Sequence, residues 1–161
     1  MAKLRRNALP YKIKQPGDLV QIDGVEGYHL GHHYYVINAI DYISGKATSA
    51  VLANKSSLST ANFLRELNAR LGFKAKAIQT DNGSEYAAKF HQAAERLGIK
   101  HCFNYVKKPI YNGKVERFKT VLSKRLSSRM KTSWSIWWKI NKKPTTPLSH
   151  IWTSITMNVL T

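Results

Sequence analysis

Three carboxylates in this chain have the types and positions to act together on a metal ion. Asp23 and Asp81 each end an apolar run, and Glu116 follows Asp81 by 35 positions (116 − 81 = 35). Glu116 is also the only acidic side chain after Glu95, among fourteen Lys and Arg residues. Carboxylate oxygens suit Mg²⁺ or Mn²⁺, and two such ions about 4 Å apart can activate an attacking oxygen and stabilise a leaving oxygen in phosphoryl transfer. The three acids are therefore candidate catalytic residues and ligands for divalent ions, with two ions expected.

Each acid taken alone has a simpler structural explanation. Residues 81–83, Asp-Asn-Gly, form a common turn sequence. Asp23 could be a polar strand residue, and Glu116 beside Arg117 could form a surface ion pair of little energetic value. For each acid alone, a structural role is a better explanation than catalysis. For the three acids together, the order of the elements that carry them favours catalysis.

The hydrophobic pattern predicts the elements that would position these acids. In chain order they are strands over 18–25, 33–43 and 46–53, a helix over 57–71, a strand over 75–80, a helix over 84–97, a strand over 99–106 and a helix over about 114–130. This order predicts an α/β fold with a mixed five-stranded sheet, its first three strands antiparallel, flanked by helices. Asp81 then ends the fourth strand, where open sheets place ligands. Glu116 lies in the first turn of the last helix, whose positive end favours a carboxylate.

Other polar residues near these motifs are interpreted as structural. Asp41 precedes the turn Ser44-Gly45 and is predicted to accept hydrogen bonds there. Glu85 is predicted to sit at a helix start capped by Ser84 rather than to bind metal. Cys102 is predicted to be a small buried side chain.

Composition restricts the class of protein and of partner. The chain has 161 residues, 43% of them apolar, enough for one compact domain. Its 26 Lys and Arg against 9 Asp and Glu give a net charge of +17, which indicates a polyanionic partner, usually nucleic acid, with an anionic membrane surface as the alternative. No apolar run approaches about 18 residues, so no membrane span is expected. The single cysteine excludes an internal disulfide, which favours a cytoplasmic protein, associated with the nucleoid if bacterial.

Four stretches together resemble one known family. They are PGDLVQID at 16–23, QTDNGSEY at 79–86, LGIKH at 97–101 and PIYNGKVERFKTVL at 109–122. The chain resembles the catalytic core of retroviral-type integrases and bacterial insertion-sequence transposases, the Asp-Asp-Glu recombinases with a ribonuclease H-like fold. The resemblance implies that Asp23, Asp81 and Glu116 bind the metal ions. It also implies cleavage at a transposon end with water, followed by attack of the freed 3′-hydroxyl on target DNA.

Several lysines flank the predicted acidic site. Lys119 and Lys114 share or flank the predicted helix face of Glu116, and Lys107 and Lys108 lie in the loop before it. All four are candidate DNA contacts, with a solvated basic surface as an equally good alternative.

The predicted organisation is a basic leader over 1–15, an integrase-like catalytic core over 16–130 and a C-terminal extension of uncertain role over 131–161. The helix-turn-helix or zinc-binding domain that relatives usually carry is not evident, which favours dependence on a separate end-recognition subunit or a truncated copy. Joining two DNA ends favours at least a homodimer. Two other functions stay open: a catalytically inactive relic that only binds nucleic acid, and a ribonuclease H-type nuclease that cleaves hybrids.

Overall fold

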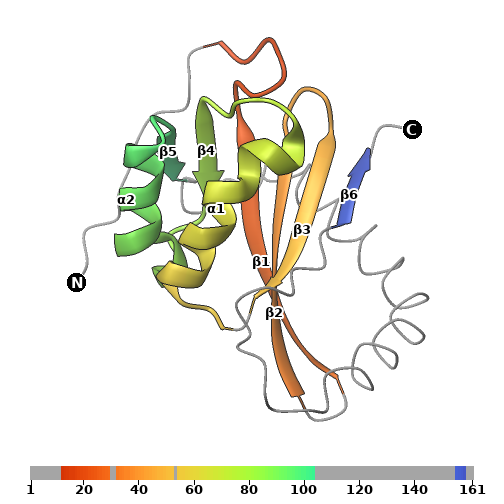
Figure 1. The fold of residues 1–161 in the computed structure, drawn as a ribbon, viewed down its shortest axis with the longest axis vertical. Helices are drawn as coiled ribbons and strands as arrows, with labels where there is room; N and C mark the ends of the chain where they lie inside the picture. Colours follow the sequence, from red (N-terminus) through yellow and green to blue (C-terminus); the bar gives the residue numbers. More distant parts are fainter. Residues whose placement is uncertain (1–11, 30–31, 53, 104–154, 159–161) are drawn as a thin grey trace.

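The fold is a six-stranded mixed sheet with two helices on one face, seen in a computed structural model that describes residues 12–29, 32–52, 54–103 and 155–158 (Figure 1). The strand order across the sheet is β5-β4-β1-β2-β3-β6. The helices α1 and α2 lie side by side, with α1 in contact with β3 and α2 in contact with β5 (Figure 1).

The first three strands form an antiparallel meander. They are β1 (Val20–His29), β2 (His32–Asp41) and β3 (Lys46–Leu52). The tight turn before β3 uses Gly45 at φ +66°, a left-handed conformation that glycine adopts without steric cost. Asp41 stabilises the same turn, because its carboxylate accepts hydrogen bonds from the backbone of Ile43 and Ser44 and from the Ser44 hydroxyl. The role predicted for Asp41 is confirmed.

The second half alternates helices with parallel strands. After α1 (Ser57–Leu71) come β4 (Ala77–Thr80), the 3-10 helix η1 (Ser84–Tyr86), α2 (Ala88–Arg96) and β5 (Lys100–Phe103). The N-cap of α1 is Ser56, whose hydroxyl accepts a hydrogen bond from the Ser59 amide, and its C-cap is Gly72 at φ +75°. Strand β4 pairs in parallel with both β1 and β5.

The core lies between the helices and one face of the sheet. Val20 and Ile22 of β1 point into it and pack with apolar residues of α1 such as Phe63 and Leu67. Since successive strand residues face opposite sides, Gln21 and Asp23 lie on the other face of β1. Gln21 is only 1% exposed, so both faces of the central strands are buried at this level.

The structure confirms the mixed sheet with three antiparallel strands followed by helix-strand alternation. The prediction of five strands is incomplete, because a sixth, β6 (Ile155–Asn158), pairs antiparallel with β3. A four-residue strand that pairs across more than a hundred positions leaves almost no local signal.

Two local predictions are wrong. β1 continues through Gly27 to His29, because each of these residues has a partner in β2, and Tyr28 packs its ring on His33. Ser84 does not cap a single helix: it begins η1, and α2 starts only at Ala88 without a side-chain cap. Neither α1 nor α2, the α-helices of the described residues, has the length and apolarity that a membrane crossing requires.

Candidate active site

The parallel register of β1 and β4 brings two of the three predicted acids together. Val20 pairs with Ile78 and Gln21 with Gln79, an offset of 58 (78 − 20 = 58). The same offset aligns Asp23 with Asp81 (81 − 23 = 58), the residue directly after the end of β4. Because neighbouring strands lie about 4.8 Å apart, the register places Asp23, in the middle of β1, beside Asp81, just past the carboxyl end of β4.

A buried polar pair lies one step below the acids on the same face. The Gln21 side-chain amide donates a 3.0 Å hydrogen bond to the Gln79 side-chain oxygen. Both side chains are nearly inaccessible, at 1% and 2% exposure. A hydrogen bond between buried side chains holds its strands in a single register, since a slip would leave both groups unsatisfied. This pair therefore stabilises the alignment of Asp23 with Asp81.

The Asp81 carboxylate is presented to solvent by a tight turn. Its Oδ1 accepts a 2.9 Å hydrogen bond from the Gly83 amide, and the side chain is exposed. One such bond uses one of about four acceptor positions of a carboxylate. Asp81 can therefore both stabilise the turn and bind a metal ion. The hydrogen bond from Gly83 orients its carboxylate, and the other acceptor positions stay available.

The residue before Asp81 is held from the neighbouring strand. The Thr80 hydroxyl lies 2.9 Å from Nε2 of His101 in β5, and it donates a hydrogen bond to the Asp81 carbonyl. His101 in turn lies 3.1 Å from His91 of α2. Side chains from β5 and α2 thus support the end of β4.

Two buried tyrosines lie behind the acids and respond to their charge. The hydroxyls of Tyr35 and Tyr86 lie 3.4 Å apart. Burial raises the pKa of Tyr86 well above its usual value, and the adjacent Tyr35 hydroxyl and then the charges of Asp23 and Asp81 raise that pKa further. Both carboxylates therefore disfavour the ionisation of the same buried hydroxyl.

The Glu85 carboxylate lies beside Tyr35 and has its own partners. Glu85 is 6% exposed and accepts a hydrogen bond from Tyr35 at 3.4 Å. Lys55 lies 3.4 Å from Glu85 and 2.6 Å from Glu26. The hydrogen bond to Glu26, and secondarily the charge of Glu85, raise the pKa of Lys55, which keeps it protonated. Glu85 is thus a buried, charge-compensated residue of η1, and the prediction that it does not bind metal stays a prediction.

The described residues contain two of the three predicted metal ligands. Glu116 lies outside them, as do the four candidate DNA contacts Lys107, Lys108, Lys114 and Lys119. Within the described ranges, no group of three or more His, Cys, Asp or Glu side chains could hold a metal ion. Asp23 and Asp81 nevertheless fit a hard divalent cation, since both offer carboxylate oxygen at an accessible edge.

Sequence reasoning missed the residues that support the acids. The available signal is the repeat of Gln-x-Asp at 21–23 and again at 79–81. Two strands with the same period-two pattern, aligned in parallel, place both glutamines and both aspartates on one face. The contributions of Lys55 and Tyr35 had no such local signal, because both reach Glu85 across the fold.

The comparisons with known proteins agree on one family. Residues 13–109 match the family model described as the integrase core domain. The chain is 26% identical over 144 residues to the retrovirus-related Pol polyprotein from transposon TNT 1-94 of Nicotiana tabacum, a match over 78% of this chain and 11% of that protein. The chain thus spans only about a tenth of that curated relative.

Solved structures give the same result. A chain in the cryo-electron-microscopy structure of the simian T-cell lymphotropic virus intasome with the PP2A regulatory subunit B56 gamma matches with a TM-score of 0.65 and 26% identity, over 92% of this chain and 55% of that chain. The HTLV-2 integrase catalytic core domain in complex with magnesium, in a trimeric form, matches with a TM-score of 0.60 and 22% identity over 83% of this chain and 91% of that one.

The catalytic core domain of BIV integrase gives a TM-score of 0.59 at 23% identity, over 70% of this chain and 71% of that one. The sheet with its helices is therefore the ribonuclease H-like fold of integrase cores. With the family model matching more than half of its length, the chain belongs to the integrase core domain family, whose general function is DNA integration.

Proposed function

We propose that this chain is the catalytic core of a metal-dependent DNA strand transferase, which processes 3′ ends and joins them to target DNA. The observation that carries the proposal is the register of β1 and β4, which aligns Asp23 with Asp81 at an accessible sheet edge. The family match and the net charge of +17 support DNA as the substrate.

In this proposal Asp23, Asp81 and Glu116 hold Mg²⁺ or Mn²⁺. Bound there, divalent ions would activate the attacking oxygen and stabilise the leaving oxygen of a phosphodiester. The Gln21–Gln79 pair keeps the two strands in register, and the turn at Gly83 holds the Asp81 carboxylate toward solvent. The protein's part is therefore to keep the acids preorganised at an edge that DNA can reach.

The proposal extends to assembly. Because joining two DNA ends needs two active sites, we expect at least a homodimer, and we expect a separate subunit or segment to recognise the ends. Two structural relatives support the expectation that the chain forms an oligomer, since one belongs to an intasome and the other is described in a trimeric form. Lys107, Lys108, Lys114 and Lys119 stay candidate DNA contacts.

The test is the full chain with Asp81→Asn. We expect Mn²⁺- or Mg²⁺-dependent joining of oligonucleotide ends to fall by on the order of 100-fold or more, because a metal ligand is lost. Salt-sensitive DNA binding should be nearly unchanged, since it depends on Lys and Arg. Glu66→Gln, which removes a half-exposed carboxylate of α1, is the matched control and should join ends normally.

Three outcomes would count against the proposal. Full joining activity in Asp81→Asn would reject the site. Tight DNA binding without joining by the unmodified chain, across a wide panel of ends, would support the inactive relic. Cleavage of RNA–DNA hybrids without joining of 3′ ends would support the nuclease.

A further inference from the structure

Gly83 orients the Asp81 carboxylate through its amide, yet its backbone conformation does not require glycine. Its φ of −59° and ψ of 145° lie in the extended region that any residue adopts. A side-chain carbon built on Gly83 would instead lie 2.5 Å from Oε2 and 2.9 Å from Oε1 of Glu85. The Glu85 carboxylate therefore occupies the space beside Gly83, and this contact is what excludes a side chain at position 83.

Three neighbouring elements hold Glu85 in this place. The Tyr35 hydroxyl of β2 donates a 3.4 Å hydrogen bond to Oε1, and the Lys55 ammonium, from the connection between β3 and α1, lies 3.4 Å from the same oxygen. The Thr60 hydroxyl of α1 donates a 2.6 Å hydrogen bond to the Glu85 carbonyl. Because the Glu85 side chain is only 7% exposed, it has little room to move away from Gly83.

Stability alone is a weak reason to bury the Glu85 carboxylate. Taking a carboxylate out of water costs free energy that largely offsets its attraction to a cation. Lys55 also has a second carboxylate, because its ammonium lies 2.6 Å from Glu26. The arrangement therefore links β1, through Lys55 and Glu85, to the turn that presents Asp81. Supporting contacts of this kind orient the ligands of metal sites.

We propose that Glu85 is a positioning residue for Asp81 and acts through Gly83. Its carboxylate limits the movement of the Gly83 backbone, whose amide orients the Asp81 carboxylate. In this role Glu85 needs no contact of its own with metal or DNA. The inference rests on the proposed function for the importance of Asp81, but the contact between Glu85 and Gly83 is a property of the metal-free chain.

The first test needs neither metal nor DNA. Hydrogen exchange of the Gly83 amide, followed by NMR in the full chain, should be about fivefold faster in Glu85→Ala, a factor that corresponds to one ordinary hydrogen bond. The Gly45 amide, which donates to the Asp41 carbonyl in the β2–β3 turn, is the internal reference and should not change. Equal acceleration at both glycines would show general destabilisation and overturn the proposal, as would unchanged exchange at Gly83.

The second test measures Mn²⁺ affinity by calorimetry without DNA. Glu85→Ala should weaken binding by about tenfold, the lower end of the range for residues that support metal ligands. Glu85→Gln keeps the size of the side chain and an acceptor for Tyr35, so it should bind Mn²⁺ nearly as tightly as the unmodified chain. Unchanged affinity in Glu85→Ala would overturn the positioning role, even with faster exchange at Gly83.

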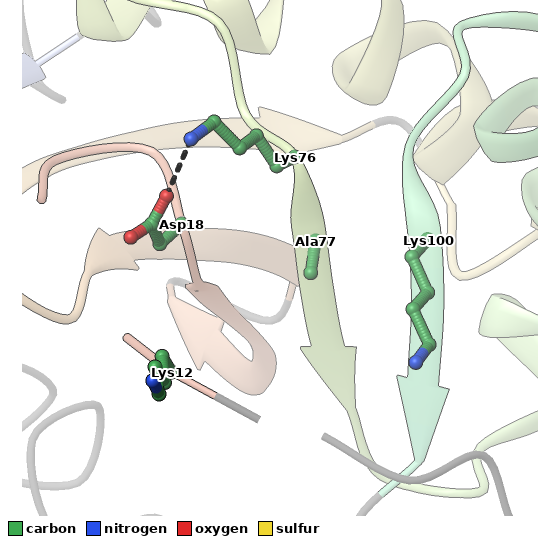
Figure 2. Close-up of a pocket in the computed structure, with 5 residues that line it drawn as sticks. All are labelled: Lys12, Asp18, Lys76, Ala77 and Lys100. Atoms are coloured by element: carbon green, nitrogen blue, oxygen red, sulfur yellow. Dashed lines mark hydrogen bonds and ion pairs between the residues drawn. The ribbon is translucent and has the colours of Figure 1, made fainter. Parts of the chain in front are cut away.

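The matched control breaks another ion pair on the same strand. Figure 2 shows Lys76 reaching to Asp18, 2.8 Å away, at the amino end of β4 and therefore at the end remote from Asp81. Lys76→Gln should lower the melting temperature while leaving Mn²⁺ affinity and Gly83 exchange unchanged. A loss of Mn²⁺ affinity equal to that of Glu85→Ala would show that reduced stability, and not position, is responsible.

A double-mutant cycle tests the contact itself. Gly83→Ala places a carbon against the Glu85 carboxylate and should weaken Mn²⁺ binding, whereas the same change in the Glu85→Ala background should have little further effect. Additive effects would show that the two residues do not act together and would overturn the proposal. If Glu85→Ala does not fold, unchanged Mn²⁺ affinity in Gly83→Ala alone would also overturn it.

The two proposals can fail separately. An unmodified chain that binds no Mn²⁺ and joins no ends would contradict the proposed function. The exchange rates at Gly83 and Gly45 would still show whether Glu85 holds the turn, because that comparison is made without metal. Conversely, normal Gly83 exchange in Glu85→Ala would overturn the inference about Glu85 while Asp81→Asn still tested the site.

Discussion

The backbone beside Asp23 lies directly against an aromatic ring. A side-chain carbon at Gly24 would overlap the Tyr35 hydroxyl and the adjoining ring atoms. Tyr35 is 2% exposed and in contact with Tyr86 and Glu85, so its ring has little room to withdraw. The absence of a side chain at position 24 therefore allows this tyrosine to pack behind the acids.

Gly24→Ala is expected to lower the free energy of unfolding by about 1–3 kcal/mol, the usual range for overpacking a filled core. Urea unfolding measures the loss. Gly98→Ala is the comparison, because a carbon built there meets nothing within 4 Å and only its φ of +67° opposes the change, at about 1 kcal/mol. A Gly24→Ala protein as stable as the unmodified chain would show that Tyr35 can move aside.

At this scale the sequence indicates the candidate ligands more readily than the residues that support them. Asp23 and Asp81 stand out because each ends an apolar run and each belongs to a recognisable motif. Tyr35, Lys55 and Gly24 belong to no motif, and their role depends on contacts between residues far apart in the chain, such as Tyr35 with Glu85, 50 positions away. Such contacts follow from tertiary packing, which local patterns do not encode.

At the scale of elements, the turn before β1 is tied to β4 and to the β2–β3 turn. Asp18 accepts two backbone hydrogen bonds from its own turn and pairs with Lys76, and Gly17 donates from its amide to the Asp41 carboxylate. The hydrogen bond from Lys76 and then those from Lys14 and Gln15 hold the pKa of Asp18 well below its usual value. Asp18 is thus expected to contribute stability only while it is ionised.

The sign of the pH dependence follows from the depressed pKa. An unfolded aspartate titrates near about 3.9, so the contribution of Asp18 is complete above that pH and is lost as the pH falls toward its folded pKa. Asp18→Asn should therefore destabilise the protein at pH 7 and flatten the loss of stability below about pH 4. Urea midpoints between about pH 2 and 7 measure both effects.

Glu66→Gln serves again as the control for this titration, since the half-exposed Glu66 pairs with Arg70 inside its own helix and ties no other element to it. Below about pH 4, the urea midpoint of Glu66→Gln should fall in parallel with that of the unmodified chain. If Asp18→Asn and the unmodified protein lost stability in parallel below pH 4, the role assigned to Asp18 would be wrong.

The elements themselves were largely predictable, and the exceptions have physical causes. The meander and α1 follow from strong alternation, helical spacing and good caps. The extension of β1 past Gly27 depends on its partner strand, which supplies ten paired residues. The break between η1 and α2 lies in a segment without a capping side chain, where local signals are weakest. The bounds 1–15, 16–130 and 131–161 stay a prediction.

At the scale of the whole molecule, charge is unevenly distributed between the two ends of the sheet. Asp23 and Asp81 lie beside each other near the carboxyl end of β4, whereas Lys76 and Lys100 lie at the amino ends of β4 and β5. Two adjacent carboxylates repel each other without a cation. The proposed function therefore makes divalent ions a source of stability as well as of chemistry.

Mg²⁺ or Mn²⁺ at about ten times its dissociation constant should stabilise the protein by about 1.4 kcal/mol, which raises the melting temperature by about 3–6 °C for a domain of this size. The double variant Asp23→Asn/Asp81→Asn should show no such rise and should melt no lower than the unmodified chain without metal, because its repulsion is gone. Sodium chloride of equal ionic strength is the control. Equal responses to the two salts would argue against a specific ion site.

The shared offset of 58 also determines which changes in chain length this protein can tolerate. Residues lost or gained between β1 and β2, or around Asn54, leave the β1–β4 pairing intact. One residue gained inside Ala77–Thr80 would turn the carboxylate of Asp81 toward α1 and α2. Natural variation in this lineage should therefore concentrate its insertions and deletions outside that short segment, however far the surrounding sequence diverges.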